Sequence, residues 1–293
     1  MMRFLRPILT FWILCLASAY GAEGEHHALP LNADPLHPFL PISNSMIMVW
    51  GAVGIIVLFC RLATKKMSLV PAGLQNFAEW VVEALYDFLE GLIGEHMIKK
   101  TFWFFGATFF FILVSNWMGL IPGVGTIGWH QYDAEGNHRW LSLLRGANAD
   151  LNLTAAMAIT FAILWFYWAV TENGIKGFLG HIFAPKGNFG GLILILMVPV
   201  FLFVGFLEVI SIMIRPVALS FRLYGNIYGG EQTLEALMAL IPSKLQMFIS
   251  WMPALPFYFV ELLVGFVQAL VFTLLCAIFL KLICDHGDED HAH

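Results

Sequence analysis

Two apolar segments in the carboxyl-terminal half of the chain, 189–240 and 248–283, are much longer than a membrane-crossing helix needs to be. About 20 apolar residues already span the hydrocarbon core of a bilayer, so segments of this length must be strongly tilted or bent to stay within it. Lipid is a consistent environment for the whole chain, because only 12% of its 293 residues are charged and its mean hydropathy is +0.78. We therefore expect a polytopic membrane protein whose last two segments form a slanted helical hairpin, turned around residues 242–256.

Three shorter apolar segments have the length of single crossings: 46–62, 102–122 and 151–170. Between the first two, residues 74–92 carry apolar side chains at steps of three and four with acidic side chains between them. This pattern is typical of an amphipathic helix at the membrane surface, and Lys99 and Lys100 are expected to close it. The predicted fold class is all-α, with about five membrane-crossing helices, a long tilted C-terminal helical hairpin and one interfacial amphipathic helix.

Basic residues between the segments predict the orientation of the chain. Arg61, Lys65 and Lys66 follow the first crossing, and Lys176 and Lys186 follow the third. Lysine and arginine concentrate on the cytoplasmic side of membrane proteins. We therefore expect an external amino terminus and a cytoplasmic carboxyl terminus.

The first 20 residues have the layout of a cleavable signal peptide, with Arg3 and Arg6, a short apolar run and then Ala17-Ser-Ala19. An uncleaved membrane helix is the alternative, although the run is short for a crossing. A secretory signal favours a multi-pass protein of a bacterial inner (plasma) membrane. The predicted organisation is a signal peptide, an external segment, a membrane domain and a polar cytoplasmic tail, at residues 1–20, 21–45, 46–285 and 286–293.

Composition gives no sign of catalysis or of nucleic-acid binding. The net charge is only −5, and the acidic residues gather in loops and in the carboxyl-terminal tail. The cysteines lack the spacing of a metal site or of disulfides. The tail histidines His286, His291 and His293 could bind a metal, but no folded scaffold is predicted to hold them. No phosphate-binding loop and no Ser/His/Asp arrangement is found. We expect no catalytic residue, no metal and no cofactor on this chain.

One basic residue, Arg222, lies inside the first of the two long apolar segments. An intramembrane arginine costs about 2.5 to 17 kcal/mol, so it is rarely kept without a use. A guanidinium stays protonated and only donates hydrogen bonds, which makes it a fixed positive charge rather than a proton carrier. Arg222 therefore predicts a carboxylate partner at membrane depth.

Other polar residues share a helix face with Arg222. At about 100° per residue, Glu208 lies on nearly the same face four turns away, and Ser211 and Arg215 extend that line. Asn226 is one turn beyond Arg222 on a similar face. By the predicted topology, Glu208 lies toward the cytoplasm.

A second polar group is predicted toward the outside. Glu231 points away from the face of Arg222, while Glu261 and Gln268 on the last segment are seven residues apart and nearly aligned. Across the hairpin, these two residues are expected to face Glu231 and Asn226. Asn116 lies near the external end of the second crossing.

Each of these residues also has a purely structural interpretation. Asn116, Asn226 and Gln268 are of a residue type that often hydrogen-bonds a neighbouring helix. The structural interpretation of Arg222 is a buried salt bridge with one of the acidic residues. The acidic residues lie on different faces and at different depths, which argues against a simple salt bridge. Ionisable residues within membrane spans favour an ion pathway.

The residues around Arg222 resemble the signature of subunit a of the rotary F-type ATP synthase, bacterial type, in Arg222-Leu-Tyr-Gly-Asn226 followed by Gly230-Glu231. Further motifs extend the resemblance over most of the chain: Val70-Pro71 with Gly73 and Glu79, Asn116-Trp-Met-Gly-Leu-Ile-Pro122, and Asp150-Leu-Asn-Leu-Thr154. Glu208 and Gln268 also fall where that family has functional positions.

The resemblance implies a non-catalytic stator subunit of the membrane Fo sector, lying against a rotating ring of c subunits. Arg222 would face the essential carboxylate of each c subunit, and ion flow, expected to be H+, would drive rotation. The implied partners are the c ring, b-type peripheral stalk subunits, the F1 sector through the stalk, and membrane lipid.

The family also has two aqueous half-channels, one on each side of the arginine. Carried over residue by residue, the cytoplasmic path is assigned to Glu208 and Ser211. The external path is assigned to five residues: Asn116, Asn226, Glu231, Glu261 and Gln268. This chain departs from some relatives, which have a histidine at the position of Glu261 and an acid at that of Gly119. The departures concern the proton relay rather than the architecture.

Two other functional classes fit the same buried charges. A self-contained secondary transporter or ion channel is one, but the chain lacks evident internal repeats and its long hairpin is asymmetric. A membrane-embedded enzyme that uses one of the glutamates as acid or base is the other, but neither a nucleophile nor a metal site accompanies them.

Overall fold

The computed structural model describes residue 33 and residues 35–37, 40–121, 124, 127–132, 138–183, 192–239 and 251–284. Within these ranges, five helices are long and apolar enough to cross a membrane. They are α2 (Asn44–Thr64), α4 (Glu95–Gly119), α5 (Leu151–Phe183), α6 (Leu192–Ala239) and α8 (Trp251–Cys284). The prediction of an all-α polytopic membrane protein with five crossing helices is confirmed. The predicted signal peptide, most of the external segment and the polar tail lie outside the described residues.

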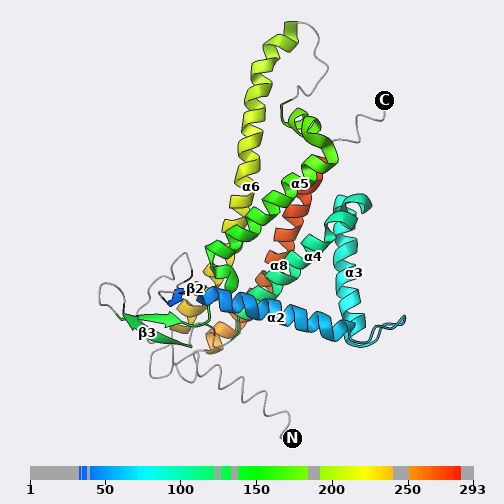
Figure 1. The fold of residues 1–293 in the computed structure, drawn as a ribbon. Helices are drawn as coiled ribbons and strands as arrows, with labels where there is room; N and C mark the ends of the chain where they lie inside the picture. The colour runs from blue at the N-terminus through cyan, green and yellow to red at the C-terminus, as the bar shows by residue number, and fades with distance from the viewer. Residues whose placement is uncertain are drawn as a thin grey trace, which may run out of the picture.

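The helix α6 is longer than a perpendicular crossing allows. Its apolar span, Pro199–Leu234, has 36 residues. At about 1.5 Å per residue it extends about 54 Å, against about 30 Å for the hydrocarbon core. The helix continues through Pro199 and Pro216. Figure 1 shows α6 at a steep angle to α2, so at least one of the two must be strongly tilted in a bilayer.

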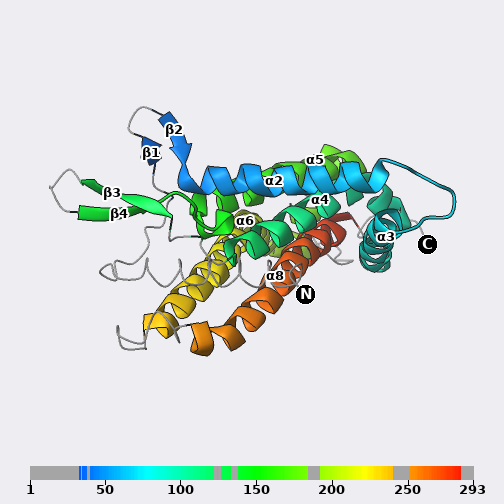
Figure 2. The ribbon, with the colours of Figure 1, turned by 90° about the horizontal axis from the view of Figure 1, so that it is seen from below.

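The helices have two distinct ends. Figures 1 and 2 place two small β-hairpins at the end where α2 begins and α6 finishes, with α3 (Leu74–Ile93) at the opposite end. The antiparallel hairpins pair β1 (Pro35–His37) with β2 (Leu40–Ser43), and β3 (Gly128–Tyr132) with β4 (His138–Ser142). These strands were not predicted. The second hairpin contains Trp129, Tyr132 and Trp140, aromatic residues that favour strands.

The amphipathic segment forms α3 as predicted, and the structure shows which face packs inward. Leu85, Leu89 and Ile93 are buried, whereas Phe77 and Trp80 are exposed. The buried side chains belong to the same hydrophobic core as those of α4 and α8. An exposed aromatic face beside a membrane domain is consistent with an interfacial position, which stays a prediction.

The helix α3 agrees with the predicted range 74–92 to within one residue, but Lys99 and Lys100 do not close it as expected. The helix finishes at Ile93, and Gly94 has φ +83°, a left-handed conformation that glycine adopts at little cost. Lys99 and Lys100 lie in the first turns of α4, where Lys99 pairs with Glu95 four residues earlier at 2.5 Å. The helix change therefore precedes the lysines that were expected to mark it.

Aromatic packing joins α4 to α5 in the core. Phe104 of α4 stacks on Phe161 of α5 at 6.3 Å between ring centroids and meets Trp168 edge-on at 5.9 Å. From α8, Phe272 and Leu280 are buried in the same core. Large buried side chains of this kind fix the relative positions of the three helices.

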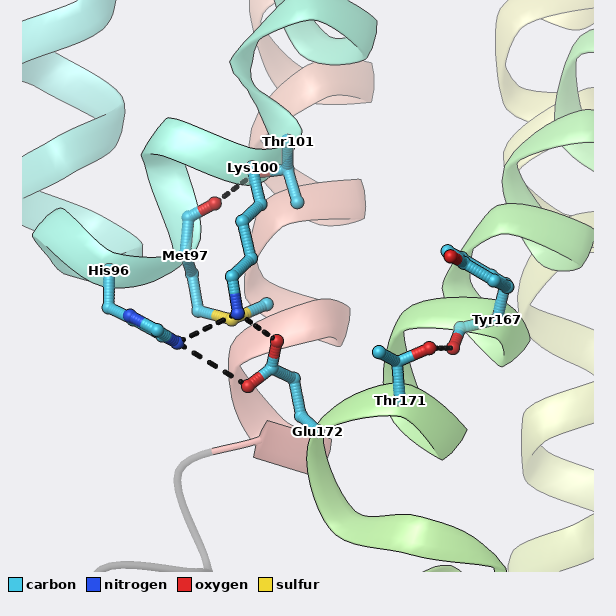
Figure 3. Close-up of polar contacts among 7 residues, drawn as sticks. All are labelled: His96, Met97, Lys100, Thr101, Tyr167, Thr171 and Glu172. Carbon is cyan, nitrogen blue, oxygen red and sulfur yellow. Dashed lines mark hydrogen bonds and ion pairs between the residues drawn. The ribbon is translucent and has the colours of Figure 1, made fainter.

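An ion-pair cluster ties α4 to α5 at the end away from the hairpins. Figure 3 shows Lys100 and His96 converging on Glu172. The Lys100 Nζ lies 2.6 Å from one Glu172 oxygen, and His96 Nε2 lies 3.5 Å from the other. Just beyond this cluster, Gly174 interrupts α5 with φ +68°.

The break at Gly174 can be tested by substitution. Gly174→Ala is expected to destabilise the protein by about 1–2 kcal/mol, because a side chain disfavours the left-handed region even though the surrounding space is open. Thermal unfolding of the purified protein in detergent would measure the loss. Gly180→Ala is the matched control, because this glycine is helical and also has open space around it. Equal stability of the two variants would contradict the expectation.

Candidate functional site

The helix α6 is the least covered of the long helices. Only 6% of its most apolar 18 residues are buried within the chain, against 44% for α4 and 39% for α8. Large apolar side chains of α6, such as Phe203, Met213 and Phe221, are more than half exposed. This face is therefore available to lipid or to a partner.

Arg222 lies on α6 and is exposed in the chain. Among the residues that the structure describes, no carboxylate lies within ion-pair distance of it. Arg222 lines a cavity of about 420 Å³ between α6 and α8. The lining residues are Leu207, Ile210, Ser211, Ile214, Arg215, Ala218, Leu219, Arg222, Leu275 and Phe279.

The predicted alignment of polar residues along α6 is present. Ser211, Arg215 and Arg222 all line this cavity. Glu208, expected on the same face, accepts a hydrogen bond from Arg215 Nη2 at 3.2 Å. The Glu208 carboxylate is thus paired with Arg215, and Arg222 has no carboxylate partner among the described residues.

The predicted contact across the hairpin is also present. Asn226 Nδ2 of α6 donates to Gln268 Oε1 of α8 at 2.5 Å. Gln268 is buried, and its Nε2 has no acceptor among the described residues. A buried donor left in this way indicates a place for a water molecule or a partner group.

A second, smaller cavity collects the remaining predicted residues. Its volume is about 10 Å³, about the space of one water molecule. Glu231 and Glu261 line it from α6 and α8, as expected, together with Asn116 of α4. The other lining residues are Gly119, Leu120 and Ile227.

Gly146 and Gly230 leave the space that the carboxyl groups of Glu231 and Glu261 occupy. A Cβ added at Gly146 would overlap Glu231 Oε1, and one added at Gly230 would overlap the carboxyl group of Glu261. Sequence reasoning missed the role of Gly146, because the residue is distant along the chain and only tertiary packing brings it to α6.

The polar contacts of Asn116 include a residue that sequence reasoning also missed. Asn116 Nδ2 donates to the Gly265 carbonyl at 2.9 Å. Its Oδ1 accepts from Asn148 Nδ2 at 2.6 Å. Asn148 lies in η1 (Ala147–Ala149), a short 3-10 turn without periodicity. The only signal was its position just before the Asp150 motif.

The same turn is anchored on its other side. The buried carboxylate of Asp150 accepts a hydrogen bond from Ser45 Oγ of α2 at 2.7 Å. Thr154 and Ser220 meet through their hydroxyl groups at 3.3 Å, joining α5 to α6. These contacts hold the turn against α2, α4, α5 and α6.

The arrangement separates two polar regions along α6. Arg222 lies 14 residues, or about 21 Å, from Glu208 and 9 residues, or about 13 Å, from Glu231. Within the described ranges, no three His, Cys, Asp or Glu side chains group as metal ligands would. Groups that accept and release protons on either side of a fixed cation suit ion transfer better than bond-making chemistry.

The Asn148 contact yields a stability prediction. Asn148→Ala is expected to cost about 1–3 kcal/mol, because the buried Asn116 Oδ1 loses its donor. Thermal unfolding of the detergent-purified protein would detect it. The control is Asn152→Ala, an exposed side chain of the next turn. If both substitutions leave stability unchanged, the contact has no structural weight.

Comparison with known proteins gives a consistent family. The family model described as ATP synthase A chain matches residues 46–281. ATP synthase subunit a of Solidesulfovibrio magneticus is 34% identical over 252 residues, which cover 86% of this chain and 87% of that protein.

More distant relatives match over similar lengths. ATP synthase subunit a of Desulforamulus reducens is 28% identical over 299 residues, covering 99% of this chain and 94% of the relative. The chloroplastic subunit a of Stigeoclonium helveticum is 28% identical over 269 residues, covering 92% of each. The chain, a multi-pass membrane protein by its five long apolar helices, therefore belongs to the ATP synthase A chain family.

Proposed function

We propose that this chain is the ion-translocating stator subunit of the membrane Fo sector, with Arg222 facing the essential carboxylate of a rotating c ring. One observation carries the proposal: Arg222 is exposed on the least covered helix, and no carboxylate among the described residues pairs with it. A guanidinium in lipid needs a counter-charge. A carboxylate presented by a neighbouring ring would supply it.

Two half-channels would then meet at Arg222. The external path would use Asn226 and Gln268, which are hydrogen-bonded, and then Glu231, Glu261 and Asn116 around the small cavity. The cytoplasmic path would use Ser211 in the larger cavity, and Glu208 beyond it. Separate polar regions on either side of one cation support this division.

The fixed charge of Arg222 explains how such a device moves an ion without leaking. A cation close to the ring carboxylate lowers the pKa of that carboxylate, so the group releases its proton on arrival. The same cation repels a positive ion that would cross directly between the half-channels. Transport must then proceed through rotation of the ring.

Rotation also provides enough energy for chemistry elsewhere. Each proton gains only about 2.3 kcal/mol per 100 mV, so several transfers must be summed. We infer that this chain makes no ATP itself and is linked to the F1 sector through b-type peripheral stalk subunits. The coupling ion would be H+.

The family also suggests a setting. We place the chain in a bacterial inner membrane, with an external amino terminus after removal of residues 1–20, an external segment at 21–45, and a cytoplasmic tail at 286–293. The end of the molecule that carries the two β-hairpins would face the outside of the cell. The cluster of Lys100, His96 and Glu172 would lie on the cytoplasmic side, as would α3.

Proton pumping tests the role of Arg222. In inverted membrane vesicles with matched assembly of the complex, Arg222→Ala is expected to reduce ATP-driven acidification to the level of vesicles treated with an uncoupler. The charge-loss control is Lys65→Ala, an exposed residue after α2 that is expected to leave acidification unchanged. Normal acidification by Arg222→Ala would mean that the arginine is structural. Ion movement by the purified chain alone in liposomes would instead favour a self-contained transporter or channel.

The external path has its own test at Gly146. Gly146→Ala is expected to slow acidification several-fold, because the added methyl group displaces the Glu231 carboxyl group from its position. Gly91→Ala is the control, since this exposed glycine of α3 also has no side chain near its added Cβ. A normal rate in the Gly146 variant, at matched assembly, would argue against a role for Glu231.

A further inference from the structure

Glu208, Arg215 and Arg222 form a heptad series on α6. Residues seven apart on a helix lie on nearly one face and about 10.5 Å apart along the axis. Arg215 is therefore midway between the proposed gate at Arg222 and the proposed cytoplasmic acid at Glu208. Any ion that passes between these two residues along α6 must pass Arg215.

Arg215 reaches Glu208 across two helical turns. Side chains on a helix lean toward its amino end, which directs the long arginine toward the earlier residue. The Arg215 Nη2 lies 3.2 Å from Glu208 Oε1, and the exposed fractions of the two side chains are 22% and 43%. The pair therefore lies at the edge of the cavity that Arg215 and Arg222 both line.

The guanidinium is held from the other side by α8. Its Cζ lies 5.0 Å from the ring centroid of Phe279, within the range of a cation–π contact. The backbone at Phe279 is fixed in turn, because its carbonyl accepts a hydrogen bond from Trp165 Nε1 of α5 at 2.9 Å. Three helices thus determine where Arg215 lies.

This geometry restricts what Arg215 can do. A guanidinium has no acceptor and stays protonated, so it cannot relay a proton. Left alone in the cavity, its charge would also repel a proton on its way from Arg222 to the cytoplasm. With Glu208 beside it, the charge is compensated, and the carboxylate is drawn along the helix toward the cavity.

We propose that Arg215 is a positioning residue that holds the Glu208 carboxylate at the cavity edge as the proton acceptor of the cytoplasmic path. The inference rests on the proposed function and assigns a role to a residue outside the two half-channel sets. Phe279 supports Arg215 in this position.

ATP-driven acidification of inverted vesicles that carry the whole complex tests the role, with rates compared at matched assembly. Arg215→Gln is expected to slow acidification several-fold, and Arg215→Lys to recover most of the rate because the charge is retained. Arg61→Gln, the same substitution at an exposed arginine of α2, is the control and should have no effect. A normal rate for Arg215→Gln would overturn the inference.

A double variant separates positioning from a merely structural ion pair. If Arg215 acts through Glu208, then Glu208→Gln with Arg215→Gln should pump no faster than Glu208→Gln alone. If the two residues only stabilise the fold, neutralising both should restore the rate lost in either single variant, since the double substitution leaves neither charge without its partner. Recovery in the double variant would therefore refute positioning.

Phe279→Leu keeps both charges and provides a test should Arg215→Gln fail to assemble. It is expected to slow acidification by a smaller factor, and an unchanged rate would count against the inference. Loss of pumping in Arg222→Ala together with normal pumping in the Arg215 and Phe279 variants would refute only the role of Arg215. Normal pumping in Arg222→Ala would refute the proposed function first.

Discussion

The rest of the structure depends on how polar groups are compensated where water is excluded. Asn226 bonds Gln268, Asn116 bonds both Gly265 and Asn148, and Glu208 bonds Arg215. Glu208 and Arg215 both belong to α6, but the other pairs join two helices or a helix and the η1 turn, so compensation of polar groups also fixes helix positions. Against this background Arg222 is different, because its compensation is not found within the described part of the chain. In the proposed assembly, the carboxylate of the ring would compensate this charge.

Helix phase could be predicted from the sequence because it depends only on the residue spacing. The facing of Asn226 and Gln268, and the shared face of Ser211, Arg215 and Arg222, followed from the rotation of about 100° per residue. Choice of partner did not follow. Glu208 pairs with Arg215 because a long side chain leans two turns back, which spacing alone does not decide.

Features that depend on tertiary packing could not be predicted from the sequence. Gly146 and Asn148 reach the site only because the η1 turn packs between several helices, and nothing in their local pattern indicates this. The role given to Lys99 and Lys100 at the end of α3 was wrong for a related reason. Lysines suggested a boundary by charge, whereas the backbone changes direction at Gly94, where a positive φ is tolerated. The hairpin strands were missed because strands of three to five residues outside the crossings carry little periodicity.

The exposed face of α6 has a consequence for friction. Apolar side chains such as Phe203, Met213 and Phe221 make contacts that have no preferred direction, unlike hydrogen bonds. A partner that slides past this face would therefore meet nearly the same contact energy at every step and would not be caught in any one register. Such a surface would offer little resistance to sliding. In the proposed assembly, the guanidinium of Arg222 would be the group on this face that attracts the ring carboxylate at each step.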